Sequence, residues 1–144
     1  MRTHDMAGHL IRRLNQRSTQ TFTQQAQAAG FSLTPVQFAA MDAIATHPGI
    51  DQAGVATMIA YDRATIGGVI DRLVQKGLVA RNVSLQDRRA REVRLTEAGE
   101  TLLAQILPVI IALQDDILAG LTPQEREVFK TLAAKAVHLA PEPD

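Results

Sequence analysis

The sequence predicts a mostly α-helical fold with one small β-hairpin, and three observations support this prediction. Apolar residues recur at helical spacing over most of the 144 residues. Two short segments, 78–84 and 90–95, alternate apolar and polar residues on either side of a charged turn. A long apolar segment, 97–119, follows them. The length is typical of one domain, so we expect residues 1–144 to form a single domain.

Composition limits the class of protein. Apolar residues make up 46% of the chain and aromatic residues only 3%, so the core must be aliphatic. The absence of cysteine excludes thiolate metal ligands and cysteine nucleophiles, and it is typical of a cytoplasmic protein. No uninterrupted apolar run approaches the roughly 20 residues that cross a bilayer, and the first residues lack an apolar signal segment. We therefore expect a cytoplasmic protein with no membrane partner.

The first two helices have clear ends. The first is predicted over 5–29 and stops at Gly30. The second begins at Thr34, which is a good N-cap, and Pro35 suits its first turn. Gln37 completes a capping-box pattern with Thr34.

Two short helices come next. Asp51 is expected to cap the third helix, and Asp62 the fourth, which covers 62–76. Two short helices joined by a tight turn form a helix-turn-helix. The buried stripe of the fourth helix is expected to consist of Ile66, Val69, Ile70 and Leu73.

The segments 78–84 and 90–95 are expected to pair as a hairpin, after which Thr96 caps a fifth helix over 97–119. This helix has little polar face. Because a surface helix needs an apolar stripe of only about 100°, we expect the fifth helix to be buried on more than one side. Pro108 should bend it.

A capping box at Thr122 and Glu125 begins a sixth helix, and the tail 140–144 should be loose. The first, fifth and sixth helices carry more apolar surface than one chain needs to bury. We therefore expect the terminal segments, 1–30 and 97–140, to pair in a homodimer. Residues 34–95 would then form a separate reading head.

Charge is unevenly distributed although the formal net charge is zero. Residues 62–94 hold eight arginines and lysines against four acids, a net charge of +4. A two-stranded ribbon with arginines at its tip can lie along phosphates or enter the minor groove of DNA. A charged turn can equally be a solvated surface. The arginines at or just after the turn are Arg88, Arg89 and Arg91, with Asp87 beside them.

Residues 87–99, DRRAREVRLTEAG, contain Asp-x-Arg followed by Leu-Thr-x-x-Gly, and RLVQKGLVAR (72–81) precedes them. With these motifs the sequence closely resembles the MarR family of transcriptional regulators over nearly its whole length. The resemblance implies a winged helix-turn-helix core plus a terminal-helix dimerisation bundle. It also implies a homodimeric, sequence-specific regulator of transcription, expected here to be a repressor, on a near-palindromic operator in double-stranded DNA. In many members a small phenolic or aromatic-acid ligand releases the DNA.

The resemblance also assigns roles by position. Arg89 would enter the minor groove, and Asp87 would orient it through a charge-assisted hydrogen bond. The helix 62–76 would read bases, because arginine can bond guanine in a bidentate manner and threonine can touch a phosphate or a thymine methyl group. The expected DNA-contacting residues are Arg63, Thr65, Gly67, Gly68, Arg72, Asp87, Arg88, Arg89 and Arg91.

Gly67 and Gly68 depart from the family pattern, because similar proteins often carry polar or basic side chains there. Two adjacent glycines within a helix cost about 2 kcal/mol relative to alanine. They let the helix backbone approach DNA closely, or they allow it to pack against a neighbouring element, or they are simply tolerated.

In similar proteins the first, second and fifth helices surround the effector pocket. The expected ligand contacts are His9, Arg13 and Met41. A positive group there can pair with a ligand carboxylate. Alternatively, His9 and Arg13 are ordinary surface charges or inter-subunit partners, and Met41 is a core residue.

The sequence contains no nucleophile motif and no glycine-rich phosphate loop, and none of its four histidines is spaced i,i+4 from another. We therefore expect no catalytic residues, no cofactor and no metal site. The alternative function is a helical homodimer that docks other proteins.

Overall fold

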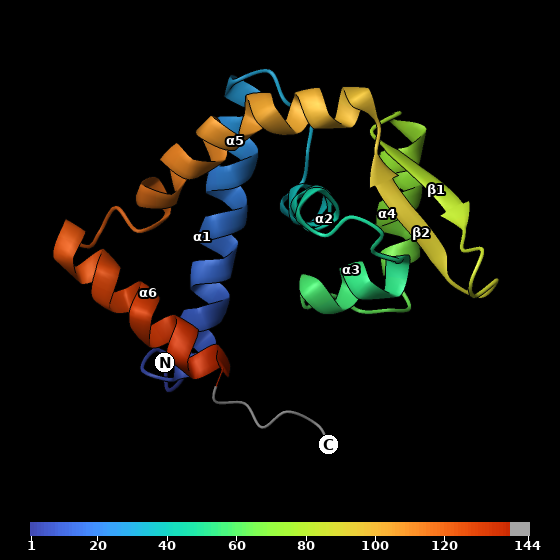
Figure 1. Cartoon of the computed structure of the whole chain (residues 1–144). Coiled ribbons are helices and arrows are strands. Elements are labelled where there is room, and N and C mark those ends of the chain that lie inside the picture. Colours follow the sequence, from blue (N-terminus) through green and yellow to red (C-terminus); the bar gives the residue numbers. More distant parts are fainter. Residues whose placement is uncertain (139–144) are drawn as a thin grey trace. The chain divides into compact units, whose positions relative to one another are not determined.

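Helices and one hairpin make up the computed structural model, which describes residues 1–138 (Figure 1). The predicted mostly helical class with a small β-hairpin is confirmed. The predicted loose tail, 140–144, lies outside the described residues. The elements are α1 (Ala7–Ala28), α2 (Pro35–Thr46), α3 (Gln52–Met58), α4 (Ile66–Gln75), β1 (Val79–Val83), β2 (Arg91–Leu95), α5 (Glu97–Ile117) and α6 (Pro123–His138).

The chain divides into two compact units. One consists of Met1–Thr21 and the segment from Ala112 onward, and the other is Phe22–Ile111. The second unit contains the whole expected reading head. It also contains the end of α1 and the first part of α5, so these two helices are each shared between units.

The predicted N-caps are confirmed for four helices, including α5, where the Thr96 hydroxyl accepts from the Gly99 amide at 3.1 Å. Thr34 and Gln37 exchange two bonds of 3.2 Å, in which each backbone amide donates to the other side chain. The Asp51 Oδ1 accepts from the Gly54 amide at 2.7 Å. Thr122 and Glu125 form the second complete capping box. Local polar side chains therefore determine where α2, α3, α5 and α6 begin.

The predicted start of α4 was wrong. The helix begins at Ile66 instead of residue 62, and its N-cap Thr65 makes no side-chain capping bond. Asp62 instead accepts from the amide of Ala64 at 3.1 Å, which forms a local turn. Arg63 therefore lies in this turn, before the helix.

An aliphatic core holds α2, α3, α4 and the hairpin together. The predicted stripe of α4 is buried throughout. The hairpin is antiparallel, and Val79 and Val93 turn inward from its two strands. A backbone bond of 3.0 Å from Val93 to Ile50 also ties β2 to the residues just before α3. The wing is thus attached to the helix-turn-helix at its base. The largest fully buried side chains of this unit are Met41, Val55, Ile66, Ile70, Leu73 and Ile106.

The start of α5 packs directly on the junction between α4 and β1. The Thr96 amide donates to the Leu78 carbonyl at 3.0 Å, and the Thr96 hydroxyl donates to the Gly77 carbonyl at 2.6 Å. A Cβ atom at Gly99 would lie only 2.1 Å from the Leu78 oxygen. These contacts explain the Leu-Thr-x-x-Gly pattern, since threonine supplies the bonds and only glycine fits the close approach.

The long helix α5 is incompletely covered by its own chain. Ile106, Ile110 and Leu113 are buried, but Leu107 and Ile111 are 39% and 63% exposed. Burial on more than one side is therefore not achieved within one chain. By length and composition α5 could span a membrane, alone among the described helices. That observation carries little weight, because core helices of soluble proteins have the same length and composition.

Candidate nucleic-acid interface

Polar contacts to the backbone shape the tip of the wing. The buried hydroxyl of Ser84 accepts from the amides of Gln86 and Asp87 at 3.2 and 3.3 Å. The Ser84 amide donates to the Ala90 carbonyl at 3.0 Å, which closes the loop. The turn is therefore held in one shape by bonds that its own residues provide.

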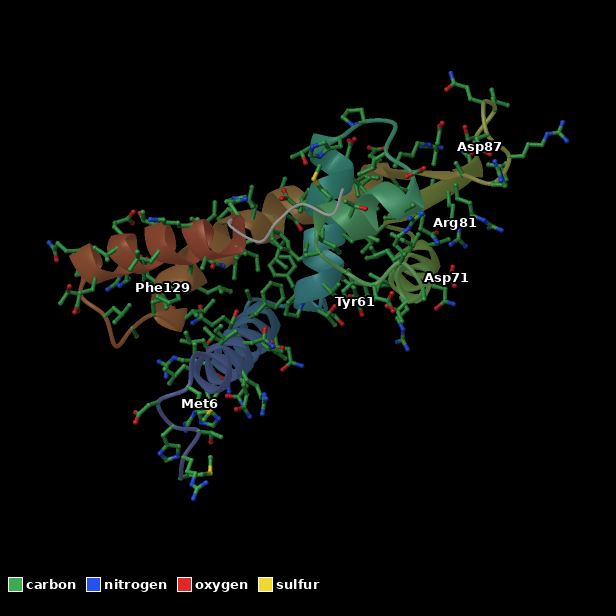
Figure 2. The ribbon with its side chains drawn as sticks, turned by 90° about the horizontal axis from the view of Figure 1, so that it is seen from below. Met6, Tyr61, Asp71, Arg81, Asp87 and Phe129 are labelled. Atoms are coloured by element: carbon green, nitrogen blue, oxygen red, sulfur yellow. The ribbon has the colours of Figure 1, made fainter. Side chains whose placement is uncertain are left out.

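Asp87 contacts Arg89 twice. Its Oδ1 accepts from the Arg89 amide at 3.0 Å, and the same atom lies 3.5 Å from the Arg89 Nε. The Arg89 side chain is 94% exposed, so its guanidinium is available to a partner. The predicted pairing of the two residues is confirmed, and Figure 2 shows Asp87 at the far end of the hairpin.

A hollow of about 470 Å³ lies between the wing and the residues that lead into α4. Arg63 lines it on one side, and Arg89 and Arg91 line it on the other. Two acids, Asp51 and Asp87, also reach it. The structure thus brings together four of the residues predicted to contact DNA, although 24 residues or more separate Arg63 from the wing.

A second group of predicted residues lies on the opposite flank of α4. Thr65, Gly68 and Arg72 line a hollow of about 330 Å³ that faces the start of α2 and Tyr61. All three residues are exposed. Arg88 is exposed at the wing tip and lines neither hollow. Seven of the nine predicted contacts therefore line one of these two hollows, while Gly67 and Arg88 line neither.

The two glycines of α4 have different surroundings. A Cβ atom at Gly67 would lie 3.3 Å from the Gln52 Nε2, a tight contact, whereas a Cβ at Gly68 would meet nothing within 4 Å. The packing alternative therefore accounts for Gly67. Packing does not account for Gly68, for which close approach to DNA and simple tolerance both remain as interpretations.

Sequence reasoning missed two residues that connect the first hollow to α4. Gln52 lines the hollow beside Arg63, and Arg81 donates to the Gln52 Oε1 at 3.2 Å. Arg81 also pairs with Asp71 of α4. No local pattern indicates such contacts, because the partners are far apart in the chain.

A third hollow, of about 600 Å³, belongs to the unit that contains the first part of α1. The residues that line it include His4, His9, Arg13 and Arg17. The His4 and His9 rings stack with centroids 5.7 Å apart. The His9 Nε2 is buried and has no hydrogen-bond partner within the described chain, so this hollow combines positive charge with an unused polar atom.

Met41, the third expected ligand contact, does not belong to the unit that holds this hollow. Met41 is completely buried in the core of the other unit and lines none of the three hollows. The core alternative for this residue is therefore the one that the structure supports.

Comparison with known proteins adds to this geometry. Residues 33–90 match the model of the MarR family. The chain is 32% identical over 138 residues to the transcriptional regulator HosA of Escherichia coli, covering 96% of this chain and 99% of HosA. The chain belongs to the MarR family. This regulator therefore has the winged helix-turn-helix fold in which α3 and α4 form the helix-turn-helix and β1 and β2 the wing.

Two solved structures extend the comparison. BpsR of Bordetella bronchiseptica, whose DNA binding is regulated by 6-hydroxynicotinic acid, is 31% identical, with a TM-score of 0.84 and coverage of 97% of this chain and 96% of BpsR. The transcriptional repressor CouR, solved on a 23-mer DNA duplex, is 25% identical, with a TM-score of 0.81 and coverage of 92% and 93%. This MarR-family regulator is thus similar over almost its full length to a DNA-bound repressor and a ligand-regulated protein.

Proposed function

We propose that this regulator is a homodimeric repressor that binds a near-palindromic DNA operator and leaves it when a small aromatic or phenolic acid binds. The observation that carries the proposal is the convergence of Arg63 with Arg89 and Arg91 around one hollow. The similarity of this chain to CouR, which was solved on a DNA duplex, supports the same function. An exposed cluster of guanidinium groups beside a helix-turn-helix suits the phosphates and base edges of a duplex.

Each subunit would place α4 in a major groove and its wing in the flanking minor groove. Arg89 would enter the minor groove, and Arg88 and Arg91 would contact phosphates. Thr65 and Arg72 would face the major groove on the flank of α4 away from the wing. With two-fold symmetry, the two half-sites would lie about one helical turn apart.

The homodimer is supported by apolar side chains that this chain leaves uncovered. No residue of α6 is buried, and Val128, Leu132 and Val137 are 58%, 59% and 71% exposed. On α5, Ile111 is 63% exposed. Exposed apolar side chains grouped on one helix, as on α6, are expected to mark a protein interface. A second copy of the chain would bury them.

The effector would occupy the hollow lined by His9 and Arg13. A carboxylate would pair with the arginine, and the buried Nε2 of His9 would gain a hydrogen-bond partner. The regulation of BpsR by 6-hydroxynicotinic acid, an aromatic hydroxy acid, supports this ligand class. Release would follow if the ligand favoured a subunit arrangement that does not match the operator spacing.

The relatives of this chain are transcriptional regulators, which supports a regulator without catalytic activity that works in the cytoplasm.

DNA binding is tested by fluorescence anisotropy with the DNA upstream of the protein's own gene and with a scrambled duplex. We expect selective, salt-sensitive binding. Arg89→Ala should weaken binding to every operator. It should also reduce the slope of log affinity against log salt concentration by about one, because one phosphate contact is lost. Lys130→Ala removes an equal charge from α6 and serves as the matched control. An unchanged affinity and salt slope for Arg89→Ala would refute the wing assignment. Absence of selective binding by the wild type would favour a protein-docking module.

Effector binding is tested by thermal shift with 6-hydroxynicotinate, salicylate and benzoate, followed by operator release. Arg13→Ala should reduce the shift, because it removes one of the two arginines that line the hollow. Arg12→Ala is the control, since the neighbouring arginine does not line this hollow. Equal losses in both variants would show that general charge, and not the hollow, attracts the acid.

A further inference from the structure

Three side chains connect α3, β1 and α4 in the reading head. The Arg81 Nη1 of β1 lies 2.6 Å from the Asp71 Oδ1 of α4. The same nitrogen donates at 3.2 Å to the Oε1 of Gln52, the first residue of α3. The Arg81 side chain is only 23% exposed, and Figure 2 shows it beside Asp71. One guanidinium therefore joins the strand of the wing to both helices of the helix-turn-helix.

Gly67 provides the space for this arrangement. The Gln52 Nε2 lies 3.3 Å from the position that a Cβ atom would occupy at Gly67. Gly67 and Asp71 are four residues apart and so lie on one face of α4. Gln52 and Arg81 thus contact the same side of α4 over one helical turn.

These contacts lie between the two parts that are proposed to enter neighbouring grooves. Gln52 lines the hollow that Arg63 shares with Arg89. Arg81 stands opposite Val93 in the middle of the hairpin. Because the contacts join α4 to the middle of the wing strand β1, they oppose a change in the angle between α4 and the wing.

We propose that Gln52, Arg81 and Asp71 are positioning residues, which hold the wing and α4 at the separation that one operator half-site requires. This inference rests on the proposed DNA binding. The chain of contacts acts on geometry more than on overall stability, because Asp71 is 52% exposed and ion pairs of that kind add little to the free energy of unfolding. Its loss would reduce selectivity for the operator, since a shape-matched site needs both contacts at once, whereas nonspecific DNA does not.

The direction in which Asp71→Asn changes operator affinity distinguishes a positioning role from a simple electrostatic one. Asp71→Asn removes a negative charge from a surface that is proposed to face DNA, so simple electrostatics predicts tighter binding. Positioning predicts weaker operator binding, by up to about fivefold, the most that an exposed ion pair commonly contributes. Glu92→Gln removes the same charge from an exposed position of β2 and is the matched control. We expect the control to bind the operator as tightly as the wild type or slightly more tightly.

A double-mutant cycle tests the link between the partners. Asp71→Asn, Arg81→Gln and the double variant should lose similar amounts of operator affinity, because either change breaks the same contact. Gln52→Ala should act in the same direction. The salt slope of Arg81→Gln should remain unchanged, whereas loss of a direct phosphate contact would reduce it by about one. Thermal unfolding of each variant shows that the fold is retained.

Two outcomes would overturn the proposal. One is tighter operator binding by Asp71→Asn, and the other is additive losses with a reduced salt slope for Arg81→Gln. Failure of the proposed function looks different, because the wild type itself would then bind no duplex selectively. Loss of fold in the Arg81 variant would leave Gln52→Ala and Asp71→Asn to decide between positioning and electrostatics.

Discussion

We expect Gly99→Ala to destabilise the protein, because the added methyl group would collide with the backbone carbonyl of Leu78. The new Cβ atom would lie 2.1 Å from the Leu78 oxygen. This is about 1 Å closer than atoms in van der Waals contact tolerate. The obstacle is backbone, so it cannot rotate away. The start of α5 would have to move off the junction between α4 and β1.

The structure allows the magnitude to be estimated. Moving α5 would break the bonds from Thr96 to the carbonyls of Gly77 and Leu78, a loss of about 2 kcal/mol. Strain from overpacking adds about 1–3 kcal/mol. The better helix propensity of alanine returns about 1 kcal/mol. We therefore expect a net loss of about 2–4 kcal/mol in the free energy of unfolding.

Urea unfolding followed by circular dichroism, at one fixed protein concentration, measures this change. Gly68→Ala is the matched control, because a Cβ there meets nothing within 4 Å. That control should gain about 0.5–1 kcal/mol from helix propensity. A Gly99→Ala variant as stable as the wild type would refute the reasoning, as would an equal loss in both variants.

Three further predictions concern the turn, base reading and assembly. Ala60 has a positive φ of 54°, so Ala60→Gly should raise the free energy of unfolding by about 0.5–1 kcal/mol in urea titrations, and a loss would contradict this explanation. Arg63→Ala should change preference at one base position in a panel of operator variants. Equal weakening for every sequence would instead identify Arg63 as a phosphate anchor. Leu132→Glu should shift sedimentation from dimer to monomer, because it places a charge on the exposed face of α6, whereas an unchanged dimer would remove α6 from the interface.

Local signals predicted most of the fold. Side-chain caps at Thr34, Asp51 and Thr122 acted within three residues of their own position, so the sequence shows them directly. The start of α4 was misplaced for the same reason. Asp62 has the chemistry of a cap, but it closes a turn just before the helix. Sequence alone does not distinguish these two local bonds.

Distance in the chain limited the prediction of the site. The arginines of the wing tip are neighbours in sequence, and the pairing of one of them, Arg89, with Asp87 was predicted correctly. Met41 was expected at a ligand and lies in the core, since an apolar residue on a helix suits either place equally well. Gln52 and Arg81 were missed, because 29 residues separate them and neither belongs to a recognised pattern.

The amino-acid sequence by itself determined the helices, the hairpin, the basic region and the family, because each depends on side chains close together along the chain. Only the tertiary structure decided which of these residues meet. It placed Arg63 opposite the wing, turned Gly67 toward Gln52 and set Gly99 against the Leu78 carbonyl. The physical reason is that such contacts depend on how separately formed elements pack, and packing is decided by the shapes of all the side chains in the core together.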